Sequence, residues 1–164
     1  MSRTTIFKGK VADEPNEWVY GYLVREDVIF QPKEHEETKC CSVGTFAVKK
    51  QTICEWTGLY DKDGRKIYTG DIVKLFNQIG EIVYTCGSYG IGISKDSIDY
   101  EKIQNFTNEN FDNNFDGTFC DNFLPLFEIY WNFNNVDDCI DEIKVIGNIF
   151  DNSELLGGAK CQSE

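Results

Sequence analysis

The sequence has a single histidine and no Cys-x-x-Cys motif among its seven cysteines. A Ser-His-Asp or Cys-His mechanism would have to use His35, which lies between Glu34 and Glu36 with no nucleophile motif nearby. A zinc site needs paired ligand spacing, and the adjacent Cys40 and Cys41 do not provide it. The cysteine and histidine pattern therefore predicts no tightly bound metal and no organic cofactor.

The sequence also lacks a run of about 18 apolar residues, so it predicts no transmembrane helix. Residues 1–10 do not contain the apolar stretch of a secretory signal peptide. An odd number of cysteines without such a signal favours reduced thiols, and therefore a cytoplasmic location.

Basic residues are scarce in the second half of the chain. Residues 1–82 contain 12 basic and 13 acidic side chains, whereas residues 83–164 contain four lysines and 15 acids. Within residues 96–142, Lys102 alone faces 12 carboxylates. This balance excludes a generic binder of the phosphate backbone, and no direct contact with nucleic acid is expected. It fits either a solubilising surface or an acidic face that binds a basic partner; the candidate contact residues are Asp137, Asp138, Asp141 and Glu142.

With 164 residues, 41% of them hydrophobic and 14% aromatic, the chain can bury the core of one domain with at most a small appendage. Short β-branched and aromatic segments alternate with turn signals, a pattern typical of small barrels. We therefore expect a mainly β fold: a small antiparallel β-barrel, SH3-like or partly open, with an N-terminal hairpin region and short helical turns. The expected limits are 1–50 for the hairpin region, 51–156 for the barrel-like domain with an acidic insertion near 96–142, and 157–164 for a disordered tail.

The clearest local signal is the order Asp61-Lys62-Asp63-Gly64, which predicts a tight turn closed by glycine. A catalytic pair could be drawn from Asp61, Asp63 and Asp71. Carboxylates at hairpin tips are usually solvated, however, with pKa values too low for general acid catalysis. We expect a structural role for them, with Asp71 capping its own turn through backbone amides.

Residues 96–135 break the pattern of short strands. Five phenylalanines recur at every fourth position among poor helix formers, and they predict an irregular or strand-like lid packed on the barrel: Phe111, Phe115, Phe119, Phe123 and Phe127. A ligand cage is the alternative. Asp112, Asn114 and Asp116 match the first half of a calcium loop and are weak metal candidates, because Phe123 stands where the bidentate glutamate is required.

Three blocks of the sequence, residues 7–10 with 17–23, 57–73 and 145–156, resemble the YopX-like proteins of phages and prophages. The resemblance implies a mostly β protein with a barrel-like C-terminal part, encoded on mobile elements and tending to oligomerise. It implies no reaction, because the family has no recognised catalytic residues to carry over.

Three function classes follow from these observations. We favour a non-enzymatic phage accessory protein that binds a host or phage macromolecule, possible partners being a basic host protein and, in a homo-oligomer, a second copy. The alternatives are a divalent-metal-dependent hydrolase using clustered carboxylates, and a structural or assembly component. Self-association is expected because a short hairpin cannot cover the aromatic side chains of Phe7, Trp18, Tyr20, Tyr22 and Phe30.

Overall fold

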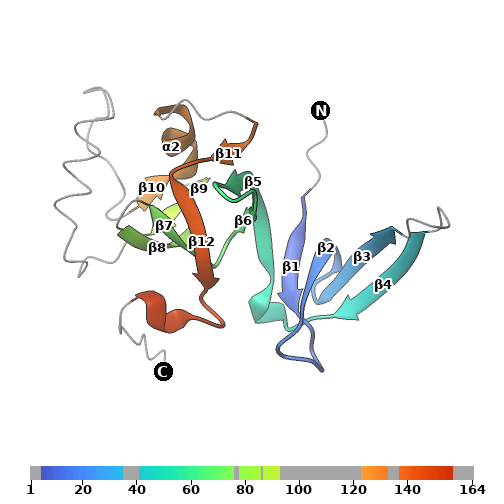
Figure 1. The fold of residues 1–164 in the computed structure, drawn as a ribbon. Coiled ribbons are helices and arrows are strands. Elements are labelled where there is room, and N and C mark those ends of the chain that lie inside the picture. Colours follow the sequence, from blue (N-terminus) through green and yellow to red (C-terminus); the bar gives the residue numbers. More distant parts are fainter. Residues whose placement is uncertain are drawn as a thin grey trace. The chain divides into compact units, whose positions relative to one another are not determined.

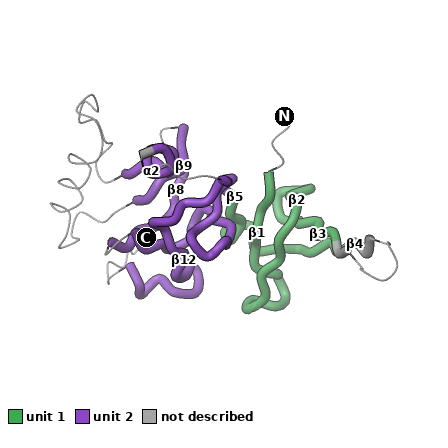
Figure 2. The backbone as a smooth tube through the Cα atoms, turned by 45° about the horizontal axis from the view of Figure 1, so that its top comes forward, with its two compact units in different colours: residues 1–56 green, residues 57–164 purple. Residues whose placement is uncertain are grey.

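A computed structural model describes residues 5–34, 41–75, 78–85, 87–92, 123–132 and 137–156 (Figure 1). The chain divides into two compact units, residues 1–56 and 57–164 (Figure 2). The boundary predicted from the sequence falls six residues earlier, between 50 and 51, and the predicted tail 157–164 lies outside the described residues. The domain limits stay a prediction, and each unit is described below by itself.

Unit 1 is built from antiparallel strands: β1 (Phe7–Lys10), β2 (Trp18–Arg25), β3 (Val28–Glu34) and β4 (Cys41–Ala47), followed by the 3₁₀ turn η1 (Lys50–Thr52). The strand β5 (Cys54–Asp61) begins in unit 1, where Cys54 pairs with Lys8 of β1, and continues into unit 2. The strands pair in the order β5-β1-β2-β3-β4. β1 and β2 form a hairpin, in whose connecting turn the Glu17 N–H donates to the Glu14 carbonyl at 2.9 Å.

The alternation of side chains along β2 determines the two faces of this sheet. Val19 and Leu23 point to a small core that also contains Ile29 and Val48. Gly21 lies between them because a Cβ there would overlap the carbonyl oxygen of Phe30. The opposite face exposes large side chains at every second position: Tyr20, Tyr22 and Val24.

Unit 2 contains the end of β5, β6 (Lys66–Tyr68), β7 (Asp71–Leu75), β8 (Gln78–Thr85), β9 (Ser88–Gly92), β10 (Phe123–Pro125), α2 (Leu126–Asn132), β11 (Cys139–Ile140), β12 (Ile143–Asn148) and the 3₁₀ turn η2 (Ser153–Leu156). Five of these strands form an antiparallel sheet in the order β10-β9-β8-β7-β12. Apolar side chains from this sheet, α2 and β11 share one core that includes Ile82, Ile91, Leu126, Ile129 and Ile140.

The mainly β fold is confirmed, but the described strands form two sheets and no closed barrel. In unit 2 the path of hydrogen-bonded strands starts at β10 and stops at β12, and the described residues contain no pairing between these two. A bulge between Val145 and Gly147 bends β12. None of the described helices is long and apolar enough to cross a lipid bilayer.

The helix α2 differs from the strand-like lid predicted for this segment. Leu126 and Ile129 are buried in the core of unit 2, and Tyr130 is partly buried against it. That spacing is helical, and it starts directly after Pro125, where helices commonly begin. Phe123 is buried as predicted, whereas Phe111, Phe115 and Phe119 lie outside the described residues.

Candidate functional site

The four acidic residues proposed from the sequence flank the short strand β11. Asp137 and Asp138 precede it, and Asp141 and Glu142 follow it. The first three are exposed and Glu142 is partly buried. We refer to these four residues as the acidic turn.

Several contacts attach the acidic turn to the body of unit 2. β11 pairs in parallel with the end of β5, and the Tyr60 N–H donates to the Asp138 carbonyl at 2.8 Å. The Cys139 thiol donates to the Asp61 carbonyl, with an S···O distance of 3.0 Å, and Ile140 is fully buried. The backbone that carries the carboxylates is therefore fixed by the core below it.

Asp137 and Asp138 both adopt left-handed backbone conformations, with φ of 56° and 58°. This conformation costs an L-residue about 1–2 kcal/mol, although aspartate and asparagine tolerate it better than most. The pairing of β11 with β5 holds both residues in this conformation. Glycine would be less strained at either position, yet both positions carry a charged side chain.

The local field is negative. The pKa of the Cys139 thiol is raised, first by burial and then by the negative charge of Asp141, with smaller contributions from Asp61 and Asp137. Lys144 follows the acidic turn in sequence, but its ammonium group pairs with Asp63 at 3.2 Å and holds the pKa of that carboxyl below its usual range. The raised thiol pKa keeps Cys139 protonated at neutral pH, which makes it a poor nucleophile.

Two exposed aromatic side chains belong to the helix that packs against β11. Phe127 and Trp131 of α2 are 50% and 71% exposed, and their spacing of four puts them on one face of the helix. The buried Leu126 and Ile129 hold the other side of α2 in the core. The Trp131 ring meets the Tyr130 ring edge-on at 5.6 Å. We call Phe127 and Trp131 the aromatic pair.

The side chains of Asp61 and Asp71 are buried, unlike the exposed aspartates of the acidic turn. Asp61 is fully buried, and its carboxylate accepts hydrogen bonds from the N–H groups of Asp63, Arg65 and Val145 at 3.0, 2.8 and 2.9 Å. Asp71 is 2% exposed and accepts the Tyr68 N–H at 2.9 Å. The expectation that these side chains are solvated is wrong for Asp61 and Asp71, and their contacts are those of structural residues.

The weak metal candidates Asp112, Asn114 and Asp116 lie outside the described residues, as do His35 and Cys40. In the part of the chain that the structure describes, no three His, Cys, Asp or Glu side chains are grouped closely enough to hold a metal ion.

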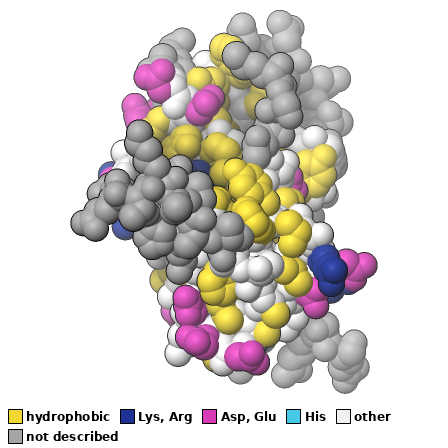
Figure 3. Space-filling view, turned by 90° about the vertical axis from the view of Figure 1, so that its right-hand side faces the viewer, with side chains coloured by type: hydrophobic (Ala, Val, Ile, Leu, Met, Phe, Trp, Pro, Cys, Tyr) yellow, Lys and Arg dark blue, Asp and Glu magenta, His cyan; other side chains and the backbone are white. Residues whose placement is uncertain are grey.

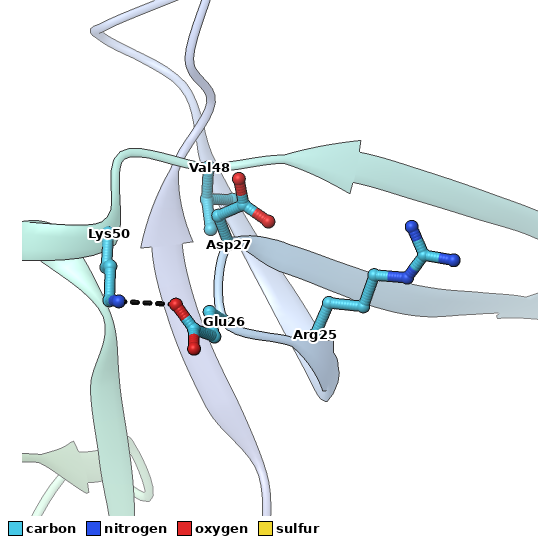
Figure 4. A pocket seen from close by; sticks show the side chains of 5 residues that line it. All are labelled: Arg25, Glu26, Asp27, Val48 and Lys50. Atoms are coloured by element: carbon cyan, nitrogen blue, oxygen red, sulfur yellow. Dashed lines mark hydrogen bonds and ion pairs between the residues drawn. The ribbon is translucent and has the colours of Figure 1, made fainter.

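A shallow hollow of about 530 Å³ lies on unit 1, lined by Arg25, Glu26, Asp27, Val48 and Lys50 (Figure 4). Lys50 pairs with Glu26 at 2.6 Å, while the Arg25 side chain extends away from that pair. Two cations and two carboxylates give this hollow no net charge and no preference for a ligand of either sign.

Comparison with known proteins gives one family. The family model described as "YopX protein" matches residues 12–157, which is most of the chain. No curated protein matches the sequence.

Proposed function

We propose that this chain, which belongs to the YopX family, is a phage-encoded accessory protein that binds a basic host protein in the bacterial cytoplasm without catalysing a reaction. The contact surface is the acidic turn together with the aromatic pair. The observation that carries the proposal is the strained left-handed backbone of Asp137 and Asp138, in the turn before β11, the strand that packs against the helix exposing Trp131.

The charge distribution supports a basic partner. Residues 57–164 hold 19 acidic and eight basic side chains, whereas residues 1–56 hold nine and eight. A surface of one sign steers an oppositely charged partner during diffusion, while a large exposed ring supplies apolar contact area once the partner arrives. Tryptophan is one of the residues most often found at the energetic centre of an interface.

The contacts of Asp61 and Asp71 support a binding role over a hydrolase. Three backbone amides occupy the Asp61 carboxylate, and the Tyr68 amide binds that of Asp71. Neither group is exposed to a substrate. No observation among the described residues favours the hydrolase built on Asp112, Asn114 and Asp116.

A second copy of the chain is the other proposed partner. Tyr20 and Tyr22 are 46% and 39% exposed on the outer face of β2, and Phe30 lies beside Tyr22 with ring centroids 6.4 Å apart. Phe7, by contrast, packs toward the core of unit 1 and contributes nothing to that face. Hydrophobic side chains gather in a band in the view of Figure 3, with acidic side chains outside it.

We further propose that the five-stranded sheet of unit 2 curves into the partly open, SH3-like barrel expected from the sequence. The bulge in β12 supports this, because bulges bend strands and are common at barrel rims.

Affinity capture from a host lysate tests the proposed function. The variant carries Asp137→Asn, Asp138→Asn, Asp141→Asn and Glu142→Gln, because asparagine tolerates the left-handed backbone while removing the charge. We expect it to lose most of the proteins that the wild type retains at about 0.1 M salt and releases at about 1 M. The charge reversal of the same four residues to lysine should weaken capture further.

The matched control neutralises four exposed acids of unit 1: Asp13, Glu14, Glu17 and Asp27. It changes the net charge by the same amount and should capture the same proteins as the wild type. Trp131→Ala should lose them at either salt concentration. Recovery of identical proteins by the neutralised acidic turn would show that these carboxylates only solvate the surface.

A further inference from the structure

The indole of Trp131 differs from that of Trp18, which already has cations of its own chain beside it. The ammonium groups of Lys8 and Lys10 lie over the Trp18 ring, 5.1 and 5.5 Å from its centroid. Such contacts form because a cation is attracted to the negative face of an aromatic ring. Trp131 is 71% exposed, and no cation of the described residues lies over its ring. This indole is therefore open to a cation from another molecule.

The chain near Trp131 offers no cation that could fill this position. The helix α2 contains no lysine or arginine. The nearest basic residues in the sequence are Lys102 and Lys144, and the Lys144 ammonium is paired with Asp63 at 3.2 Å. The Tyr130 ring meets the indole at an interplanar angle of 87°. Because an edge-to-face contact covers at most one face of a ring, the other face of the indole is not covered by Tyr130.

Two carboxylates of the acidic turn are open in the same way. Asp137 and Asp138 are exposed, and neither side chain has an ion pair or a hydrogen bond to a described residue. They directly precede β11, which packs against α2 (Figure 1). Free negative charge and an open aromatic face therefore lie on neighbouring elements of unit 2, and together they complement a cation that can use both.

We infer that the partner docks on the exposed face of α2 through an arginine-bearing segment, whose guanidinium groups stack on Trp131 and pair with Asp137 and Asp138. This inference rests on the proposed function, because it names the residue by which the basic partner is recognised. It concerns the acidic turn and the aromatic pair, and it leaves the exposed face of β2 aside.

The chemistry of the two basic side chains separates arginine from lysine at this surface. The guanidinium group is planar, so it stacks on an indole while its N–H groups reach carboxylates at the edge of the ring. The lysine ammonium is a compact and strongly hydrated charge, which pairs with a carboxylate but does not stack. The carboxylates alone fit either residue, and the open indole selects arginine.

Two labelled peptides of equal charge test the inference by fluorescence anisotropy with the full chain. Both alternate glycine and serine with several cations, which are arginines in one peptide and lysines in the other. At about 0.1 M salt the wild type should bind the arginine peptide about twofold to fivefold more tightly, the increment of one exposed cation–π contact. Salt at about 1 M should release both peptides.

Variants of Trp131 assign this preference to the indole. Trp131→Leu keeps an apolar side chain without an aromatic face, so it should bind the two peptides equally. Trp131→Phe keeps a ring and should retain part of the preference. Tyr84→Leu is the matched control, because Tyr84 is an aromatic residue of β8 that is 61% exposed, and its loss should leave the preference unchanged.

The outcomes separate this inference from the proposed function. Equal affinity of the wild type for the two peptides would overturn the inference and leave a basic partner standing. A preference that persists in Trp131→Leu, or that is lost equally in Tyr84→Leu, would also overturn it. Binding of neither peptide at about 0.1 M salt would contradict the proposed function as well.

Discussion

Asp61 and Asp138 lie on neighbouring parts of one parallel pairing, yet the two side chains are used in opposite ways. The Asp61 carboxylate is fully buried and accepts three backbone N–H groups. Asp138 is exposed on a left-handed backbone, and its main-chain carbonyl accepts the amide of Tyr60, the residue before Asp61. The interactions of Asp61 are therefore directed inward to the fold, whereas the Asp138 charge is presented to solvent.

This difference shows why a cluster of carboxylates in the sequence is ambiguous. A buried carboxylate is stable only when donors surround it, and the backbone of the turn and of β12 supplies those donors to Asp61. An exposed carboxylate has no such requirement and remains available to a partner.

The largest effect is expected from Asp61→Ala. It removes the charged acceptor of the partly buried hydrogen bonds from the N–H groups of Arg65 and Val145. Each hydrogen bond to a charged group contributes about 1.5–3 kcal/mol, so we expect a loss of about 3 kcal/mol in the free energy of unfolding, measured with urea. Asp63→Ala is the control, since it removes only an exposed ion pair with Lys144 and should destabilise far less. Equal losses would mean that Asp61 is not the centre of the turn.

A much smaller effect is expected from the double variant Asp137→Asn, Asp138→Asn. Asparagine adopts the left-handed conformation as readily as aspartate, so the free energy of unfolding should stay within about 0.5 kcal/mol of the wild type. Asp138→Val is the contrasting variant, because a β-branched side chain is strained at positive φ and should cost about 1 kcal/mol or more. If the asparagine variant were the less stable of the two, the carboxylates would be structural, as in Asp61.

Part of this contrast could be predicted from the sequence. The Asp-x-Asp-Gly order predicted the turn, and Gly64 has the positive φ of 75° that such a turn needs. The burial of Asp61 could not be predicted, because one of its partners, Val145, is 84 residues away. The charge pattern also identified the four residues of the acidic turn, but their backbone conformation depends on the pairing of β11 with β5.

The aromatic pair was missed for a different reason. A spacing of four puts phenylalanines on one face of either a helix or a strand, so it did not distinguish a lid from a helix. Leu126, Ile129 and Tyr130, directly after Pro125, were the available helical signal. Phe127, one of the five phenylalanines predicted to pack on the barrel, is half exposed because Leu126 and Ile129 occupy the core-facing side of α2.

The smallest effect concerns the thiol of Cys139, which reports the field of the acidic turn. Burial raises the pKa of this thiol most, and the charge of Asp141 raises it further. A raised folded-state pKa favours the protonated thiol, so its contribution to stability is complete at neutral pH and declines as the pH rises through that pKa. Asp141→Asn removes the second cause and should lower the pKa.

Alkylation by iodoacetamide at about pH 8.5, followed by peptide mass spectrometry, measures this shift. The rate at Cys139 should rise in Asp141→Asn, since only the thiolate reacts and a lower pKa raises the thiolate population at this pH. Cys54 is the internal control, because it is buried in unit 1 and its rate should not change. An unchanged rate at Cys139 would mean that burial alone sets its pKa, and that the charge of Asp141 is already screened by solvent before a partner arrives.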